Sequence, residues 1–392
     1  MGVMFAPDNY SVREYGGMIS DRQRMDAFAA ALREAIQPGD VVLDIGTGTG
    51  VFALLARSYG AARVYAVEPG DVIEVARRCE RDNPGECEIS WIQAISTQVE
   101  LPERVDVVIA DLHGSLPFHP ANIASMNDAR RRHLKPKGRI IPLRDTLYAV
   151  PAQATDEYAD LEEPWSGNRH QLRLDAARNF VSNSIWRARP AAVDPSHLLA
   201  APASWGTVDY SEVDSPDLDG CLSWKVERAG KLHGFYVWFD CETAPGFGFS
   251  NAPTLPSLVY GRSFFPAESA LEVSIGDRIQ MRISANLVTG EYIFRWRTRI
   301  FGADGILRAD FRQSTFAGQL ITAADLRRAS SDWQPKLNAD GVLDLKLLQE
   351  MANGRSLDAI ASDARETNPG RFASQSDARA HVSRLAARYT ER

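Results

Sequence analysis

The pattern of hydrophobic and polar residues changes twice along the chain. From residue 21 to 145, helical repeats alternate with short β-branched runs, which predicts a parallel sheet with helices on both faces. We expect helices at 26–36, 51–58 and 72–81 and strands at 41–45, 64–68, 88–92 and 105–110. From residue 146 to 318 the helical repeat disappears, and aromatic, β-branched segments recur between Gly, Pro and Asn turns. These features predict an antiparallel barrel or sandwich.

Helical periodicity returns from residue 319 to the end of the chain. A leucine-rich stretch predicts one helix that ends near Gly354, and Ser356 and Ser376 are candidate N-caps of two more. The three blocks predict an α/β protein with three domains, at 1–145, 146–318 and 319–392.

Composition and charge narrow the class of protein. A net charge of −7 and a pI of about 5.6 argue against a nucleic-acid backbone as the main partner. The apolar runs are far shorter than a membrane span, and the N-terminal segment has no signal-peptide core, so we expect a cytoplasmic protein. The four cysteines form no C-x-x-C pair, and no metal site or disulfide framework is expected. The basic cluster at 130–133 is interpreted as a solvated helix end before a turn at 135–138.

A glycine-rich loop joins the first strand to the helix that follows it. In LDIGTGTG, Gly46, Gly48 and Gly50 let the chain turn sharply and let a ligand approach the backbone. The spacing differs from the G-x-G-x-x-G that binds a dinucleotide pyrophosphate. Asp44 can hold a ligand ammonium through water, and Glu68, which ends the next strand, can bind both ribose hydroxyls. This set predicts S-adenosylmethionine as cofactor; the alternative is an ordinary strand–turn–helix.

Five segments of the chain resemble the protein arginine methyltransferases. They are YGGMISDRQRMDAFAAAL (15–32), VVLDIGTGTGVFALLARSYGAARVYAVEPG (41–70), LPERVDVVIADLHGS (101–115), LKPKGRIIP (134–142) and GKLHGFYVWFD (230–240). The resemblance implies a Rossmann-like class I methyltransferase domain followed by a β-barrel domain for substrate binding and dimerisation.

The resemblance also implies further cofactor contacts. Met18 is expected to lie over the cofactor, and Arg24, in Asp21-x-x-Arg24, to pair with the cofactor's carboxylate. Ile95 and Ser96 are expected to flank the adenine. Taken alone, Arg24 is an ordinary residue of a surface helix, and only its place in the motif indicates this role.

The loop VIADLHGSLPFHP (108–120) departs from the family pattern. The resembled enzymes carry two glutamates there, which clamp a substrate guanidinium in bidentate geometry. In this chain Asp111 takes the first place and Pro120 the second. The family's Thr-His-Trp motif is also missing, because PSLVYG (256–261) occupies that region. The sequence therefore predicts that fold and cofactor are retained while the acceptor has changed.

A less cationic acceptor fits the remaining residues. Methyl transfer from a sulfonium is an in-line displacement that depends mainly on proximity and orientation. A carboxylate oxygen needs no general base, whereas an amine, hydroxyl or imidazole must lose a proton. Asp111, His113 and His119 are the candidate catalytic residues. Either histidine is a candidate base or a hydrogen-bond donor that orients a carboxylate; the alternative is that both merely line the loop.

Two further segments bear on partners. The insertion EEPWSGNRHQLRLDAARNF (162–180) is of the kind through which members of the resembled family form homodimers. The tail at 337–389, with L-N-x-x-G and N-G-x-S-L-x-x-I-A, resembles small winged-helix domains that bind leader peptides of ribosomally made natural products. A helical dimerisation or capping element is the alternative for this tail.

These observations support three hypotheses of function. The first is an S-adenosylmethionine-dependent methyltransferase that tailors a ribosomally made peptide, with carboxylate O-methylation preferred over N-methylation. The second is a protein arginine N-methyltransferase in which Asp111 acts alone. The third, of another class, is a cofactor-binding scaffold or regulator without turnover.

Overall fold

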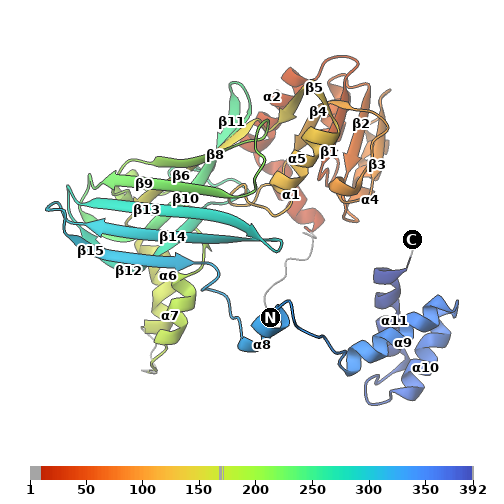
Figure 1. The fold of residues 1–392 in the computed structure, drawn as a ribbon. Helices are drawn as coiled ribbons and strands as arrows, with labels where there is room; N and C mark the ends of the chain where they lie inside the picture. The colour runs from red at the N-terminus through yellow and green to blue at the C-terminus, as the bar shows by residue number, and fades with distance from the viewer. Residues whose placement is uncertain (1–9, 167–169, 171, 391–392) are drawn as a thin grey trace. The chain divides into compact units, whose positions relative to one another are not determined.

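A computed structural model describes residues 10–166, 170 and 172–390. The chain separates into two compact units, Met1–Leu320 and Ile321–Arg392 (Figure 1). The first unit contains a parallel sheet and two antiparallel sheets, and the second unit is helical.

The N-terminal part of the first unit is built on a five-stranded parallel sheet of order β3-β2-β1-β4-β5 (Figure 1). The strands are β1 (Val41–Ile45), β2 (Arg63–Val67), β3 (Glu88–Ile92), β4 (Val105–Ala110) and β5 (Leu134–Ile141). The helices are α1 (Val12–Ser20), α2 (Arg22–Ala35), α3 (Val51–Ser58), α4 (Ile73–Asp82), η1 (Ser96–Gln98) and α5 (Asn122–Arg132). This confirms the predicted Rossmann-like architecture.

The strand order reverses between β1 and β4. From β1 the polypeptide passes through α3 to β2 on one side, and from β4 it passes through α5 to β5 on the other side. Because such crossovers are right-handed, these two helices cover opposite faces of the sheet. Ligands of open α/β sheets bind at the carboxyl ends of the strands beside this reversal. The glycine loop after β1 and the loop after β4 both lie there.

Strand β5 differs from the sequence prediction, which placed a turn at 135–138. Leu134 pairs with Val105 and Arg139 with Val107, so residues 135–138 form a bulge inside one strand.

The basic cluster at 130–133 ends α5, and its arginines form ion pairs. Arg130 and Arg131 both bind Asp214, and Arg132 binds Asp128 and Glu100. The cluster is therefore a neutralised helix end.

The second part of the first unit consists of two antiparallel sheets. One has the order β7-β12-β10-β6-β8, with β11 paired to β10, and the other has the order β15-β14-β13-β9. The strands are β6 (Arg144–Ala152), β7 (Trp186–Arg187), β8 (Ala203–Asp209), β9 (Leu218–Lys225), β10 (Gly230–Ala244), β11 (Phe247–Ser250), β12 (Ser263–Val273), β13 (Arg278–Val288), β14 (Glu291–Phe301) and β15 (Leu307–Ser314). The sheets approach each other at β8 and β9 and at β12 and β15, an arrangement consistent with the predicted barrel.

Two helices interrupt the antiparallel part between β6 and β7. They are α6 (Thr155–Ser166) and α7 (Asp175–Ser182), which pack against each other and are linked by an ion pair between Glu162 and Arg178. The short helix η2 (Pro195–His197) follows β7. The predicted dimerisation insertion at 162–180 covers the end of α6 and most of α7; its residues 167–169 and 171 lie outside the described residues.

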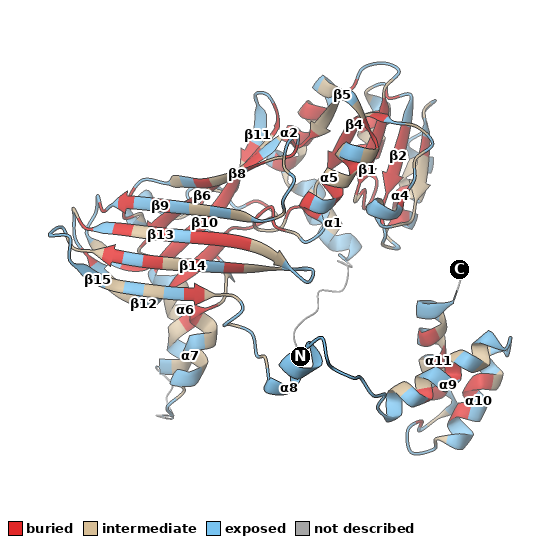
Figure 2. Cartoon of the chain, in the orientation of Figure 1, coloured by how far each residue is buried: buried red, intermediate tan, exposed pale blue. Residues whose placement is uncertain are grey.

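One hydrophobic core connects the parallel sheet to the antiparallel sheets (Figure 2). Phe28 of α2 packs against Phe249 of β11, with ring centroids 5.9 Å apart. Phe118, in the loop after β4, packs between Trp205 and Phe294 of the antiparallel sheets. This loop is therefore fixed by aromatic packing on both sides.

The second unit has its own core. Its helices are α8 (Ala323–Arg328), α9 (Ala339–Ala352), α10 (Leu357–Thr367) and α11 (Gln375–Tyr389). Leu343 and Leu347 of α9 pack with Ile360 of α10 and Val382 of α11. The predicted helices are confirmed, but no strand of a wing is assigned among the described residues from 321 to 390.

The caps of these helices correct one prediction. Ser356 accepts a hydrogen bond from the backbone N–H of Ala359 and caps α10, as predicted. Helix α11 is capped by Ser374, not by Ser376, because Asp377 lies three residues after Ser374 and completes a reciprocal capping box.

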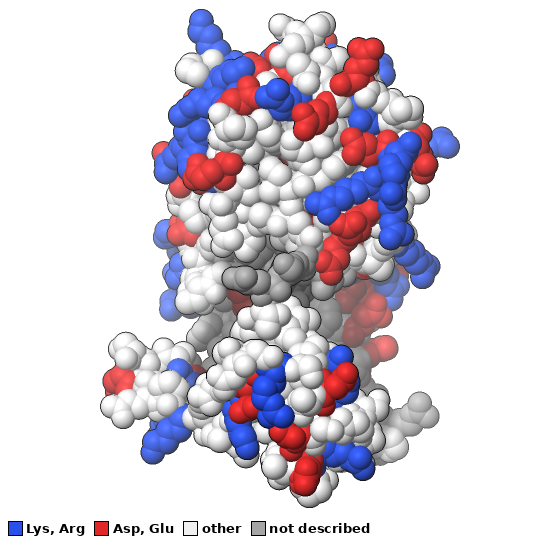
Figure 3. Space-filling view, turned by 90° about the vertical axis from the view of Figure 1, so that its right-hand side faces the viewer, with Lys and Arg blue, Asp and Glu red and all other residues white. Residues whose placement is uncertain are grey.

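The surface and the helices bear on nucleic-acid and membrane partners. Figure 3 shows a face on which Lys and Arg side chains are interspersed with Asp and Glu side chains. Such a mixed face does not offer the continuous basic stripe that binds a phosphate backbone. In the described part of the chain, no helix has the length and apolar character needed to cross a membrane.

Candidate active site

The glycine loop after β1 has the backbone conformation that only glycine adopts freely. The φ angles of Gly46, Gly48 and Gly50 are 69°, 52° and 85°. Gly48 also lies against the ring of Tyr15 in α1, where a Cβ atom would approach Cε1 to 2.4 Å. Gly50 is the N-cap of α3. The loop therefore brings bare backbone to the carboxyl end of the sheet, with α1 close above it.

Two buried carboxylates flank this loop. Glu68 accepts hydrogen bonds from the backbone N–H groups of Gly48, at 3.1 Å, and Gly70, at 2.8 Å. Asp44 accepts a hydrogen bond from Thr47 Oγ1 at 2.5 Å through Oδ2, while its Oδ1 is buried without a partner among the described residues. A buried oxygen of this kind is costly unless a ligand or water donates to it.

Burial shifts the titration of both groups. It raises the pKa of Asp44 to about 7, although the Thr47 hydroxyl favours the ionised form. Burial also raises the pKa of Glu68, against the two backbone donors. A cationic ligand group next to Asp44, and hydroxyl donors next to Glu68, would satisfy both carboxylates. The two residues thus fit the ammonium and the ribose of S-adenosylmethionine.

The other predicted cofactor residues lie around the same edge of the sheet. Met18 is half-buried in α1, and its carbonyl accepts a hydrogen bond from Arg24 Nη1 at 3.1 Å. Ile95 is exposed. Ser96 begins η1 and donates to Ser125 Oγ of α5 at 3.2 Å. The roles of Met18, Ile95 and Ser96 in cofactor binding stay predictions.

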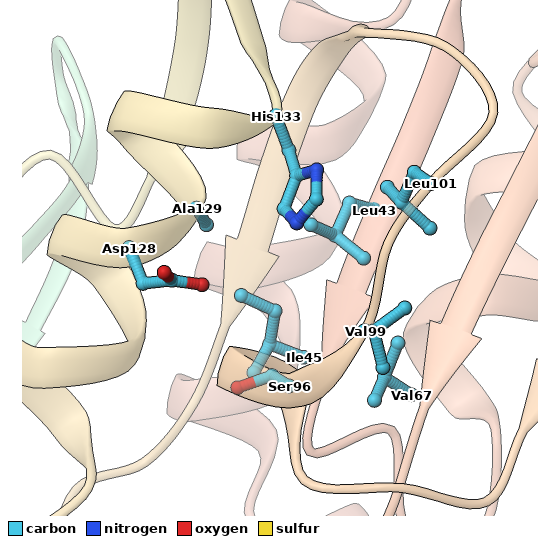
Figure 4. A pocket seen from close by; sticks show the side chains of 9 residues that line it. All are labelled: Leu43, Ile45, Val67, Ser96, Val99, Leu101, Asp128, Ala129 and His133. Atoms are coloured by element: carbon cyan, nitrogen blue, oxygen red, sulfur yellow. The ribbon is translucent and has the colours of Figure 1, made fainter.

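A small cavity lies beneath η1. It has a volume of about 10 Å³ and is bordered by Ser96, Asp128, His133 and apolar side chains of β1 and β2 (Figure 4). The Nε2 atom of His133 is buried, and no residue that the structure describes bonds it. The volume suits one water molecule and is far too small for an adenine ring. This cavity is therefore a void of the core and no part of a cofactor site.

Asp111, at the end of β4, belongs to a buried chain of polar side chains. Its Oδ2 accepts hydrogen bonds from Arg24 Nε at 2.6 Å and Tyr260 Oη at 2.7 Å. Its Oδ1 lies 2.7 Å from His113 Nδ1, and His113 Nε2 lies 2.8 Å from Asp145 Oδ2. Both oxygens of Asp111 are therefore engaged within the protein, and its side chain is only 6% exposed.

This row of hydrogen-bonded side chains extends from Asp145 into both parts of the first unit. Tyr210 donates its hydroxyl to Asp145, and Asn122, at the start of α5, donates to Tyr210 Oη at 2.9 Å. The ring of His113 stacks on Phe239 of β10, with 5.1 Å between centroids. This network joins the loop after β4 to β6 and β10.

The charges in this network stabilise one another. Burial opposes ionisation of Asp111, but the charge of Arg24 and the donor His113 outweigh it, so the pKa of Asp111 lies well below its ordinary value. Burial also disfavours a charged His113, yet the charge of Asp145 and the bonds to both carboxylates raise its pKa to about 10. Both ring nitrogens of His113 thus face protein carboxylates, and its two predicted roles toward an acceptor stay predictions.

His119 and Pro120 lie just before α5. The backbone N–H of Ala121 donates to His119 Nδ1 at 3.3 Å, so His119 helps to begin α5. Pro120 is exposed. The catalytic role of His119 stays a prediction.

Asp145, Tyr210 and Tyr260 were not predicted from the sequence. Their partners lie 32, 65 and 149 residues away along the chain, so no local spacing connects them. The one signal was the segment PSLVYG, in which Tyr260 appears where the resembled family has a different motif. Asp21, in the motif with Arg24, is also structural, because it accepts a hydrogen bond from the backbone N–H of Val259 at 2.7 Å.

Comparisons with known proteins agree with this architecture. Residues 42–138 match the family described as a methyltransferase domain, and residues 144–297 match the arginine methyltransferase oligomerization subdomain. Protein arginine methyltransferase 10 from Arabidopsis thaliana has the same fold, with a TM-score of 0.67, 20% identity, and coverage of 78% of this chain and 97% of that one. The Trypanosoma brucei PRMT1 enzyme–prozyme heterotetramer with AdoHcy gives a TM-score of 0.69 at 19% identity, covering 76% and 97%.

Curated relatives define the family. The probable protein arginine N-methyltransferase 6 of Arabidopsis thaliana is 27% identical over 57% of this chain and 53% of its own length. The chain spans 53% to 58% of the length of this and two rice relatives. Protein arginine N-methyltransferase 6 of Danio rerio is 31% identical over 59% of this chain and 69% of its own length. With this match and both domain matches, the chain belongs to the protein arginine N-methyltransferase family.

Proposed function

We propose that this chain is an S-adenosylmethionine-dependent methyltransferase that acts on a peptide or protein. The observation that carries the proposal is the pair of buried carboxylates at the glycine loop, where Asp44 Oδ1 has no partner in the described part of the protein. S-adenosylmethionine supplies an electrophilic methyl group on its sulfonium. Glu68 would accept the ribose hydroxyls and Asp44 would face the ammonium. Arg24 would keep its Nε on Asp111 and turn Nη1, which here bonds the Met18 carbonyl, to the cofactor's carboxylate.

The remaining residues orient the acceptor. Methyl transfer requires an attacking atom in line with the bond that breaks, and fixed side chains supply most of this advantage. Asp111 ends β4 at the edge of the sheet where ligands bind, and His113 and Tyr260 hold it in place. We assign the acceptor to this region.

Two acceptors are in question. The names of the relatives support an arginine nitrogen more directly than any other atom. The loop after β4 supports a carboxylate oxygen as acceptor, because Asp111 is already engaged by Arg24 and Pro120 stands where the family has a second acid. A carboxylate acceptor on a ribosomally made peptide is our finer proposal, and protein arginine is the second candidate.

The experiment uses S-adenosylmethionine with a labelled methyl group and two sets of acceptors, arginine-rich peptides and the peptides encoded beside the gene. Methyl groups released by mild base indicate an ester, and stable ones indicate nitrogen. Glu68→Ala is the control, since losing a charge-assisted hydrogen bond should weaken cofactor binding by about 1.5–3 kcal/mol. Cofactor binding without transfer to any peptide would favour the scaffold hypothesis, and no binding would exclude methyl transfer.

Two proposals concern assembly and location. We propose a homodimer formed through α6 and α7, which lie within the matched oligomerization subdomain. We also propose that the protein acts in the cytoplasm and that the second unit recruits the peptide substrate. A helical capping role is the alternative for that unit.

A further inference from the structure

His113 lies between two carboxylates, and each of its ring nitrogens faces one of them. Nδ1 is 2.7 Å from Asp111 Oδ1 and Nε2 is 2.8 Å from Asp145 Oδ2. A neutral imidazole has one N–H and one lone pair, so one contact would bring a lone pair against a carboxylate oxygen. Both contacts are favourable when both nitrogens carry a proton and donate. The side chain is 1% exposed, so no water competes for these positions.

The cluster around His113 is balanced in charge. Two cations, Arg24 and His113, alternate with two anions, Asp111 and Asp145. The other groups that face His113 are neutral: Tyr210 and Tyr260 present ring edges, Phe239 stacks on it, and the Cys241 thiol is close by. The negative charge of Asp111 is therefore cancelled before any acceptor arrives.

A guanidinium acceptor needs a carboxylate whose negative charge is not already cancelled. It binds where carboxylate oxygens are free and carry uncompensated charge. Here the guanidinium of Arg24 already occupies Asp111 Oδ2, and His113 occupies Oδ1. A second cation at this place would face Arg24 and the imidazolium at short range, which is unfavourable in a buried site.

We propose that His113, held by Asp145, neutralises Asp111 and thereby makes the acceptor site selective for an uncharged or anionic group. Asp145 and His113 act here as specificity-determining residues, and neither needs to exchange a proton with the substrate. The inference rests on the proposed methyl-transfer site, which it deepens by naming the acceptor class. It also explains why Asp145, on the first strand of the antiparallel part, is buried with 0% exposure.

A metal ion is the competing occupant of the same cluster. Ligand atoms of His113, Asp145 and Cys241 lie within 4.8 Å of one another, and Asp145 Oδ1 has no hydrogen-bond partner within the described ranges. However, His113 Nε2 and Asp145 Oδ2 already bond each other directly, and a metal would have to part them. The test therefore includes the zinc content of the purified protein.

The first measurement compares an arginine-containing peptide with its citrulline counterpart, which has the same shape without the charge. Both peptides are titrated into protein saturated with S-adenosylhomocysteine. The binding of S-adenosylhomocysteine to the same protein samples is measured as well, and it tests the cofactor site separately. Wild type should show no preference for arginine. His113→Gln should shift the preference toward arginine by about tenfold or more, the effect expected for one neighbouring charge. His233→Gln, at a buried histidine outside the network, is the matched control.

The second measurement works even when neither peptide binds. Nitrogen NMR should find His113 doubly protonated at pH 7.5 in wild type and singly protonated in Asp145→Asn, which removes one anion while keeping the shape. A tenfold preference for arginine in wild type would overturn the proposal. A neutral His113, one zinc per chain, or an unchanged peptide preference in a folded His113→Gln would also overturn it.

Discussion

Asp44 shows how one buried atom specifies a ligand. Its Oδ2 is satisfied by Thr47, but Oδ1 lies in the protein interior, and no described residue makes a hydrogen bond of ordinary geometry to it. In the free protein this arrangement disfavours the carboxylate, which is why burial raises the pKa of Asp44 to about 7. A ligand ammonium reverses the preference, because it supplies both a donor and a positive charge.

Cofactor binding should therefore depend on pH through Asp44. Above pH 7 the carboxylate is ionised and can pair with the cofactor's ammonium, and below pH 7 it binds a proton instead. The affinity for S-adenosylmethionine should fall as pH is lowered from 8 to 6, by at most about tenfold for each unit below the pKa. Calorimetry across this range measures the effect. Asp44→Asn should bind weakly at every pH, and an equally steep dependence in that variant would assign the titration to another group.

Gly48 gives a second prediction at the scale of single residues. Gly48→Ala would force a side chain into a φ of 52° and against the ring of Tyr15. We expect cofactor affinity to fall by about tenfold, the cost of moderate backbone strain. Gly16→Ala is the matched control, since Gly16 lies in α1 with open space around it and alanine favours a helix. Equal affinities of the two variants would show that the loop does not approach the ligand closely.

The elements themselves were largely predictable from local patterns. The strands at 41–45, 88–92 and 105–110 have the predicted bounds, because β-branched runs between turn residues need only local information. The bulge in β5 was not predictable, since it depends on how Leu134 and Arg139 pair with β4. The residues of the candidate site likewise divide into those with local sequence signals and those without. The glycine loop and Glu68 are local signals, whereas the chain from Asp111 to Tyr210 depends on contacts made only in the folded protein.

Helices α6 and α7 carry the prediction at the scale of elements. Leu172, which is 60% exposed, precedes α7 in the sequence and belongs to the matched oligomerization subdomain. If this arm forms the dimer, Leu172→Glu would place a charge in an apolar contact and raise the dimer dissociation constant by more than about tenfold. Light scattering at micromolar concentration measures the mass. Ile275→Glu, at an equally exposed position between β12 and β13, should leave the dimer intact. A monomeric wild type would refute the homodimer itself.

At the scale of the whole molecule, the chain consists of two units with separate cores. The first holds the complete glycine loop, the network around Asp111 and the antiparallel sheets, and it ends at Leu320. The second has a core of its own, formed by α9, α10 and α11. None of the residues that we assign to the cofactor or to the acceptor belongs to the second unit. Its contribution to catalysis would therefore come through recruitment, which acts by raising the local concentration of a tethered substrate.

Removing the second unit separates recruitment from chemistry. A chain ending at Leu320 should bind S-adenosylhomocysteine as tightly as the full chain, because every carboxylate and glycine of that site remains. Its KM for a methylated peptide should rise by about tenfold or more, since the effective concentration that a short linker provides is lost. Its kcat should stay unchanged, because Asp111 and its partners are intact. In the full chain, Val342→Glu and Leu345→Glu, on the exposed side of α9, should raise the same KM if the peptide docks there. An unchanged KM in the shortened chain would assign the unit to capping or dimerisation, and loss of cofactor binding would show that the first unit depends on the second for its fold.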